Sequence, residues 1–121
     1  MSPRAIDFIL CPVTDLRRAA DFYRDVLGLK PGVYSEAHQW AEFECGNVTL
    51  SLKGNSPPGA TDADLRLAFS VADISVAYTE LRARGLTPAA PQDHGVCQHL
   101  EIRDPDGHVV ILHHRADGTA G

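Results

Sequence analysis

Two stretches of the sequence, VTDLRRAADFYRDVLGLKP (residues 13–31) and VADISVAYTELRARGLTP (residues 71–88), follow one pattern. Each places an Asp, Asp15 or Asp73, where it can cap the start of a helix, and continues with apolar residues at helical spacing. Each then has a Gly-Leu pair at the place where a helix would stop. The repeat therefore predicts one helix in each of two equivalent halves.

The residues around the two helices predict the same strands in each half. An apolar strand precedes each helix, and a strand pair follows each one. The preceding strands are AIDFILCPV (5–13) and LRLAFSV (65–71), and the pairs are QWAEFECGNVTLSLK (39–53) and CQHLEIRDPDGHVVILHH (97–114). The first pair turns near Gly46-Asn47 and the second at Asp-Pro-Asp-Gly, which is good turn chemistry. A weaker pattern in residues 32–38 and 88–95 allows one further short strand in each half.

We therefore predict an α+β fold of two βαβββ modules in a single domain, residues 1–121. Module one covers about residues 5–56 and module two about residues 64–115, and residues 116–121 form a flexible tail. The alternative is a generic α+β sandwich of two unrelated halves, which the matching order and caps make less favoured.

Composition excludes several classes of function. The formal net charge is −5 and the sequence has no run of Lys or Arg, which argues against nucleic acid or an anionic membrane as a partner. The start, MSPRAIDFIL, has no apolar stretch long enough for a signal peptide or a membrane span. Three cysteines lie far apart with no C-x-x-C pair, which indicates free thiols in a reducing cytoplasm.

The motifs VTDLRRAADFYRDVLGL and DPDGHVVILH resemble those of the vicinal oxygen chelate superfamily, over residues 5–115. This family contains glyoxalase I, extradiol dioxygenases, fosfomycin-modifying enzymes and bleomycin-resistance proteins. The resemblance implies that each module curls its strands into half of a cup. Two modules would close around a small-molecule ligand, within one chain or across a homodimer.

The resemblance also implies four metal-ligand positions on cup-facing strands, which fall here on Phe8, Ser51, Arg66 and Ile111. Phe and Ile offer no lone pair, a guanidinium only donates, and a single Ser hydroxyl is a poor ligand. We therefore expect no cofactor at the usual site, although a divalent metal elsewhere stays open. Glyoxalase I activity, which depends on these ligands, is not expected.

Strand alternation predicts which side chains pack and which face the cup. The packing set under the helices is Phe43, Leu50, Leu52, Leu100, Ile102, Val110 and Leu112. The cup set is Phe8, Leu10, Trp40, Glu42, Ser51, Arg66, His99, Glu101 and Ile111. An apolar and aromatic wall with a few polar groups is typical of a ligand site.

Several of these residues have two interpretations. Arg66 either forms a structural ion pair with a nearby carboxylate or binds an anionic ligand. Glu101 and His99 either form an acid–base pair or are a solvated charge and a satisfied imidazole. Glu42 likewise either contacts a ligand or is a solvated or ion-paired charge. Trp40 either packs or gives a planar ligand a stacking face.

The remaining histidines give weaker indications of a functional role. His113 and His114 point to opposite faces of one strand and are interpreted as mostly surface residues, and His38 and His94 lie in loops where sequence shows no partner.

The favoured function is a metal-free small-molecule-binding protein of the glyoxalase/bleomycin-resistance type, with Phe8, Trp40, Glu42, Ser51, Arg66 and Ile111 as ligand-binding residues. The alternative is an enzyme of the same superfamily, a lyase, isomerase or dioxygenase. It would use a relocated metal at Glu42, His99 and Glu101, or metal-free acid–base chemistry by Glu101 and His99. A module that serves only a protein partner is a third possibility, so the sequence leaves open whether the chain is an enzyme.

Overall fold

The computed structural model describes residues 1–2, 4–60 and 65–120. The chain divides into two compact units, residues 1–62 and 63–121. The predicted start of module two at residue 64 and the last residue of the predicted tail, residue 121, lie outside the described residues.

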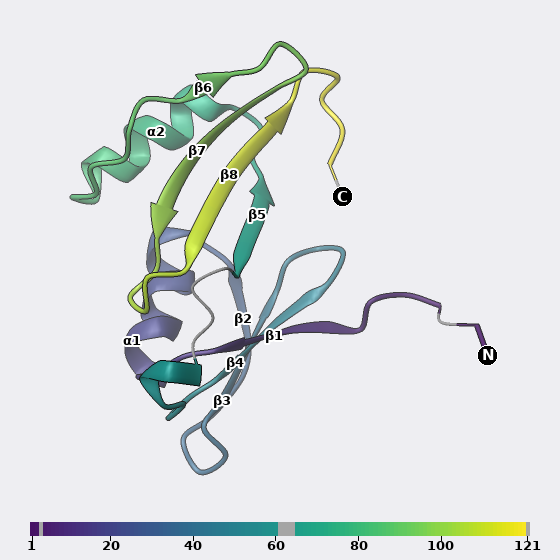
Figure 1. Cartoon of the computed structure of the whole chain (residues 1–121), viewed down its shortest axis with the longest axis vertical. Helices are drawn as coiled ribbons and strands as arrows, with labels where there is room; N and C mark the ends of the chain where they lie inside the picture. Colours follow the sequence, from purple (N-terminus) through teal and green to yellow (C-terminus); the bar gives the residue numbers. More distant parts are fainter. Residues whose placement is uncertain (3, 61–64, 121) are drawn as a thin grey trace. The chain divides into compact units, whose positions relative to one another are not determined.

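Unit 1 is a βαβββ module. Its elements are β1 (Phe8–Pro12), α1 (Leu16–Asp21), a π-helical turn η1 (Phe22–Val26), β2 (Lys30–Ser35), β3 (Trp40–Glu44), β4 (Thr49–Lys53) and a 3₁₀ turn η2 (Pro58–Ala60). The strands form one sheet in the order β1-β4-β3-β2 (Figure 1). β1 runs parallel to β4, and the other pairs are antiparallel.

Unit 2 repeats this topology. Its elements are β5 (Arg66–Ser70), α2 (Ile74–Ala83), β6 (Gln92–Asp93), β7 (Cys97–Arg103) and β8 (Val109–Arg115). Their sheet order, β5-β8-β7-β6, is the order of unit 1 with each strand replaced by its equivalent. The prediction of an α+β fold with two βαβββ modules is therefore confirmed, including the additional short strand in each half.

The repeated caps form as predicted. The Asp15 carboxylate accepts a hydrogen bond from the Arg18 amide at 3.1 Å, and Asp73 accepts from two amides at the start of α2. Gly28 and Gly85 follow the helices with φ of 69° and 88°, a conformation that glycine adopts without strain.

The helical segment of unit 1 differs from the single helix that periodicity predicts, because α1 gives way to η1 after Asp21. The two halves differ by one residue here, since Asp15 to Gly28 spans 13 positions (28 − 15) and Asp73 to Gly85 spans 12 (85 − 73). A π turn takes up one extra residue within a helix. The insertion therefore widens one turn and leaves the cap and the terminating glycine in place.

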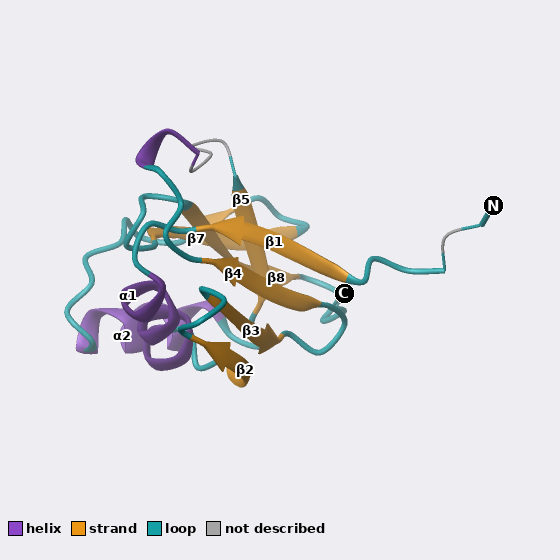
Figure 2. Cartoon of the chain, turned by 90° about the horizontal axis from the view of Figure 1, so that it is seen from below, coloured by secondary structure: helices purple, strands orange, loops and turns teal. Residues whose placement is uncertain are grey.

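One face of each sheet is covered by its helix: α1 contacts β3 and β4, and α2 contacts β7 and β8 (Figure 2). The predicted packing residues lie on these faces and are all buried, with Leu52 and Val110 at 0% exposure. Each fully buried side chain of this kind contributes about 1.5–3 kcal/mol. The strand register is fixed by this burial, because a slip of one residue would turn the whole apolar set to the other face. Within the described ranges, no helix has the length and apolar character of a membrane span.

Candidate functional site

The predicted ligand-facing residues of unit 1 lie together on the face of the sheet opposite α1. On β1, Phe8 pairs in register with Thr49 and Leu10 with Ser51. On the other side of β4, Glu42 of β3 pairs with Ser51. Phe8 and Leu10 are 49% and 46% exposed. Unit 1 therefore presents an apolar surface on its helix-free face, with the carboxylates of Glu42 and Glu44 beside it.

Trp40 contacts both an aromatic ring and a carboxylate on this face. Its ring meets the Phe8 ring edge-to-face, with the centroids 6.2 Å apart and the planes at 79°. Its indole Nε1–H donates a hydrogen bond to Glu42 Oε2 at 3.2 Å. The carboxylate is thereby held beside the aromatic pair, while its second oxygen accepts no hydrogen bond from the described residues.

Ser51 is the most enclosed polar residue of the set. It is 0% exposed, and its hydroxyl has no hydrogen-bond partner among the described residues. An unsatisfied buried hydroxyl costs about 1–3 kcal/mol. Its neighbours in register are Leu10 and Glu42, so the hydroxyl lies between an apolar side chain and a carboxylate.

The predicted residues of unit 2 also share its helix-free face. Ile111 of β8 pairs with Ala68 on one side and Glu101 on the other. His99 pairs with His113, so these two imidazoles occupy adjacent strands of the same face. His114 points the other way and its Nδ1 meets the Val71 carbonyl oxygen at 3.0 Å.

His99 lies between two polar groups. Its Nε2 is 3.8 Å from Glu101 Oε1, and its Nδ1 is 2.7 Å from His94 Nε2. The first contact brings together the two residues considered as an acid–base pair from the sequence, and their role stays a prediction. The second involves a histidine for which the sequence showed no partner, because it depends on the β6–β7 turn folding back.

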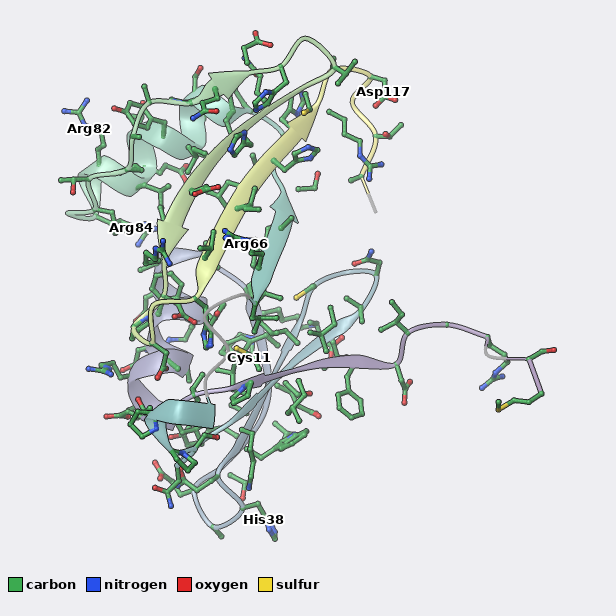
Figure 3. All side chains as sticks on the ribbon, in the orientation of Figure 1. Cys11, His38, Arg66, Arg82, Arg84 and Asp117 are labelled. Atoms are coloured by element: carbon green, nitrogen blue, oxygen red, sulfur yellow. The ribbon has the colours of Figure 1, made fainter. Side chains whose placement is uncertain are left out.

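Arg66 opens β5 and is exposed (Figure 3). Arg66 pairs in register with Val109 of β8. Glu101 lies on β7, which is two strands away from Arg66. Among the described residues of its unit, no carboxylate lies within ion-pair distance of its guanidinium. The structural ion pair considered as the simpler explanation of Arg66 is therefore not formed with any carboxylate that the structure describes in unit 2.

Sequence reasoning missed the polar centre of the second hairpin. Asp104 and His108 are both buried, and His108 Nδ1 lies 2.7 Å from Asp104 Oδ2. The other oxygen of Asp104 accepts hydrogen bonds from the amides of Asp106 and His108. The DPDGH sequence could have indicated this arrangement, since an Asp that opens a turn commonly bonds to amides further along it.

A shallow depression lies on the helix-bearing side of unit 1, between α1 and β2. The Arg17 guanidinium stacks on the Tyr34 ring there, 4.0 Å from its centroid. Burial and a hydrogen bond to Glu36 raise the pKa of Tyr34, and the charge of Arg17 opposes them. The polar side chains that line it already have partners, since Arg24 donates to Asp21 and Asp25 and the Tyr34 hydroxyl donates to Glu36. We therefore do not assign the candidate site to this depression.

Cys45, at the end of β3, is half-buried, and burial raises the pKa of its thiol, with a smaller contribution from the charge of Glu44. Because the thiolate is the nucleophile, iodoacetamide should label Cys45 more slowly at pH 8 in the folded chain than in urea. Labelling should accelerate only at higher pH. Glu44→Gln should move that rise to lower pH. Peptide mass spectrometry reads each cysteine separately, and equal rates for folded and unfolded Cys45 would contradict this prediction.

The fold defines a class: two βαβββ modules in one chain, each with a helix on one face of its sheet. Comparison with known proteins agrees. Residues 5–112 match the family described as the Glyoxalase/Bleomycin resistance protein/Dioxygenase superfamily. The chain belongs to this superfamily, as its motifs predict.

One curated relative is biphenyl-2,3-diol 1,2-dioxygenase 3 of Rhodococcus globerulus, 31% identical over 123 residues. The match covers 93% of this chain but 63% of that protein, so the chain spans less than two thirds of this relative.

Two solved structures share the fold. TnmS3, an antibiotic binding protein from Streptomyces sp. CB03234, has a TM-score of 0.82 at 23% identity and covers 96% of this chain and 99% of its own. Lactoylglutathione lyase from Agrobacterium tumefaciens has a TM-score of 0.76 at 24% identity, covering 93% and 95%.

Proposed function

We propose that the chain binds a small, flat and largely apolar molecule on the helix-free face of its sheet. The observation that carries this proposal is the aromatic pair on unit 1, where Phe8 is 49% exposed and meets Trp40 edge-to-face. Leu10, 46% exposed, extends the same surface. Apolar surface gathered beside a few polar groups is typical of a ligand site, and a planar ligand gains most from aromatic side chains.

The polar groups indicate the ligand's chemistry. Glu42 keeps one carboxylate oxygen without a described donor while Trp40 holds the other, and Ser51 lies next to it in register. A ligand with a hydrogen-bond donor, such as a phenolic hydroxyl or an amine, would complement this acceptor. On the helix-free face of unit 2, Arg66 and Ile111 are the other proposed ligand-binding residues, with Arg66 suited to an anionic group.

The four positions that hold metal in the family do not suit a metal here. Phe8 and Ile111 offer hydrocarbon, Arg66 only donates hydrogen bonds, and the Ser51 hydroxyl is the single oxygen donor. We therefore propose binding without a metal at these positions. The names of two similar proteins favour this ligand class: one is called an antibiotic binding protein, and the other acts on an aromatic diol.

An enzyme is the second candidate, favoured by the 3.8 Å approach of His99 Nε2 to Glu101 Oε1. In this scheme Glu101 and His99 would move a proton on a ligand bound at the unit 2 face, and Arg66 would hold an oxyanion. A homodimer and a cytoplasmic location also remain parts of the proposal.

Trp40 is the only tryptophan of the chain, so its fluorescence reports this face alone. Biphenyl-2,3-diol should quench it saturably, after correction for absorption by the diol. Glu42→Gln should weaken binding about 10- to 100-fold, since a hydrogen bond to a charged group contributes about 1.5–3 kcal/mol. Glu44→Gln, two residues along the same strand and on the same face, is the matched control. The Thr49 hydroxyl already donates to the Glu44 carboxylate, so this variant should bind like the unmodified chain.

Two results would contradict the proposal. One is the absence of saturable quenching by both the diol and 1-naphthylamine, which carries an amine in place of hydroxyls. The other is equal affinity of the Glu42→Gln and Glu44→Gln variants, which would remove Glu42 from the site. Consumption of the diol by the chain, lost in Glu101→Gln, would favour the enzyme.

A further inference from the structure

Two imidazoles of unit 2 form a direct hydrogen bond. His94 Nε2 lies 2.7 Å from His99 Nδ1, and the two rings are within 16° of parallel. Among the described residues, no third Cys, His, Asp or Glu brings a ligand atom close enough to both nitrogens to share a metal ion with them. The contact therefore holds one proton, which one ring donates and the other accepts through a lone pair.

This pair lies across the turn that joins β6 to β7 (Figure 1). The His94 amide donates to the Cys97 carbonyl oxygen at 2.8 Å, and Gly95 between them has a φ of 83°. Since Gln92 and His99 are opposite in register, His94 and His99 are diagonal neighbours on the helix-free face. β6 has only two residues, so the side-chain contact is one of few ties between this edge of the sheet and β7.

The Glu101 carboxylate favours one arrangement of the proton. Glu101 Oε1 lies 3.8 Å from His99 Nε2, within ion-pair distance. An ionised carboxylate only accepts, so it favours a hydrogen on His99 Nε2. In the neutral pair, His94 Nε2–H then donates to His99 Nδ1. When one proton is added, His99 becomes an imidazolium that donates to His94 and faces Glu101, so the hydrogen bond persists.

A second added proton removes the hydrogen bond between the rings. Both facing nitrogens then carry a hydrogen, so neither can accept, and two cations lie in contact. Of the acids that the structure describes, only Glu101 comes within ion-pair distance of either ring. The Asp93 carboxylate instead accepts from the Gly95 amide at 2.8 Å.

The other titratable or charged groups on this face add no compensating anion. They are Cys97 of β7 and His113 and Arg115 of β8, and Arg115 donates to the Thr119 hydroxyl. The helix α2 packs on the opposite face of β7 and β8. Repulsion between two protonated rings is therefore opposed by a single carboxylate.

We propose that His94 and His99 form a pH-sensitive clasp, which holds the β6–β7 turn closed near neutral pH and releases it when both rings are protonated. The stabilisation that the clasp provides is present at neutral pH and is lost as the pH falls. An imidazole ordinarily gains its proton near pH 6.5, so mild acid is sufficient to operate such a clasp. The clasp rests on neither the ligand-binding face of unit 1 nor the proposed enzyme chemistry.

Hydrogen exchange of the His94 amide, measured by NMR on the full chain from pH 7.5 downward, tests the clasp. Ring signals of His94 and His99 in the same samples show when both rings are protonated. Each exchange rate is divided by that of an unstructured peptide at the same pH. The resulting protection should fall about tenfold, near the upper end of what one hydrogen bond contributes, because charge repulsion adds to its loss.

The equivalent turn in unit 1 is an internal control. The Cys45 amide donates to the Val48 carbonyl oxygen at 3.1 Å, and Gly46 between them has a φ of 90°. This turn has the same length as the turn from His94 to Cys97 but contains no histidine. Protection of the Cys45 amide should therefore stay constant over the same pH range.

Two replacements of His99 should abolish the pH response in opposite ways. His99→Phe removes the acceptor, so the His94 amide should be weakly protected at every pH. His99→Asn places an amide oxygen near the position of Nδ1, which accepts from His94 Nε2–H whether or not His94 is charged. Protection should then stay high. His113→Gln, which changes the cross-strand neighbour of His99, should keep the response of the unmodified chain.

Three results would overturn the clasp: equal protection of the His94 amide before and after both rings are protonated, a pH response that persists in His99→Phe, or one that disappears in His113→Gln. Circular dichroism identifies a misfolded variant, and the comparison of His94 with Cys45 in the unmodified chain needs no variant. Diol binding measured through Trp40 is a separate readout, so failure of either proposal is recognised independently.

Discussion

Replacing Asp104 with Ala should lower the free energy of unfolding by about 3–5 kcal/mol, because it removes a buried carboxylate that accepts several hydrogen bonds, and each hydrogen bond to a charged group contributes about 1.5–3 kcal/mol. The Asp104 side chain is 0% exposed and accepts bonds from two amides as well as facing His108 Nδ1 at 2.7 Å. The substitution leaves these donors buried without an acceptor. Asp104→Asn should cost less, because its carbonyl oxygen can still accept from the amides.

Urea unfolding followed by far-ultraviolet circular dichroism measures this effect, since Trp40 lies in the other unit. Asp117→Ala is the control. The Asp117 carboxylate also accepts two hydrogen bonds, from the Thr119 amide and hydroxyl, but near the exposed end of the chain (Figure 3). It should change stability by less than about 0.5 kcal/mol, as surface substitutions usually do. If Asp104→Ala and Asp117→Ala lower the free energy of unfolding equally, burial does not explain the effect of Asp104→Ala.

Gly54→Ala should destabilise the chain by about 1–3 kcal/mol, the usual cost of overpacking. Gly54 is buried just after β4, and its amide donates to the Gln39 carbonyl oxygen at 2.8 Å. A Cβ there would lie 2.6 Å from Gln39 Oε1 and 2.7 Å from Leu16 Cβ. The Gln39 side chain can rotate away, but Leu16 Cβ moves only with the first turn of α1.

Gly59→Ala is the matched control, because a Cβ on Gly59 meets no atom within 4 Å among the described residues. Unfolding followed by Trp40 emission should shift for Gly54→Ala and stay unchanged for Gly59→Ala. Adding Gln39→Ser should recover only part of the loss, since the Leu16 contact remains. Full recovery would show that Gln39 alone limits the space at Gly54.

Features that depend on a few neighbouring residues were predictable from the sequence. The caps at Asp15 and Asp73 and the glycines after the helices form as expected, because each involves atoms within one or two turns. Even the π turn at Phe22–Val26 has a signal, the extra residue of the first half. Sheet faces were predictable for the same reason, since alternation and burial together leave one register.

Contacts between segments were not predictable. His94 meets His99 because β6 is two residues long and its turn folds back over β7, which no periodic pattern shows. Arg66 does not pair with Glu101 because the strand register places Glu101 two strands away, on β7, which the sequence does not show.

The sequence by itself therefore determined the repeated βαβββ modules, their caps and the side chains that share a sheet face. Only the tertiary structure decided which of those side chains touch: Trp40 with Glu42, Asp104 with His108, and His94 with His99. The physical reason is the distance along the chain over which each effect acts. Backbone propensity and alternation act over a few residues and survive in the sequence, whereas the distance between two polar groups is set by register, turn closure and packing, which the whole unit fixes together.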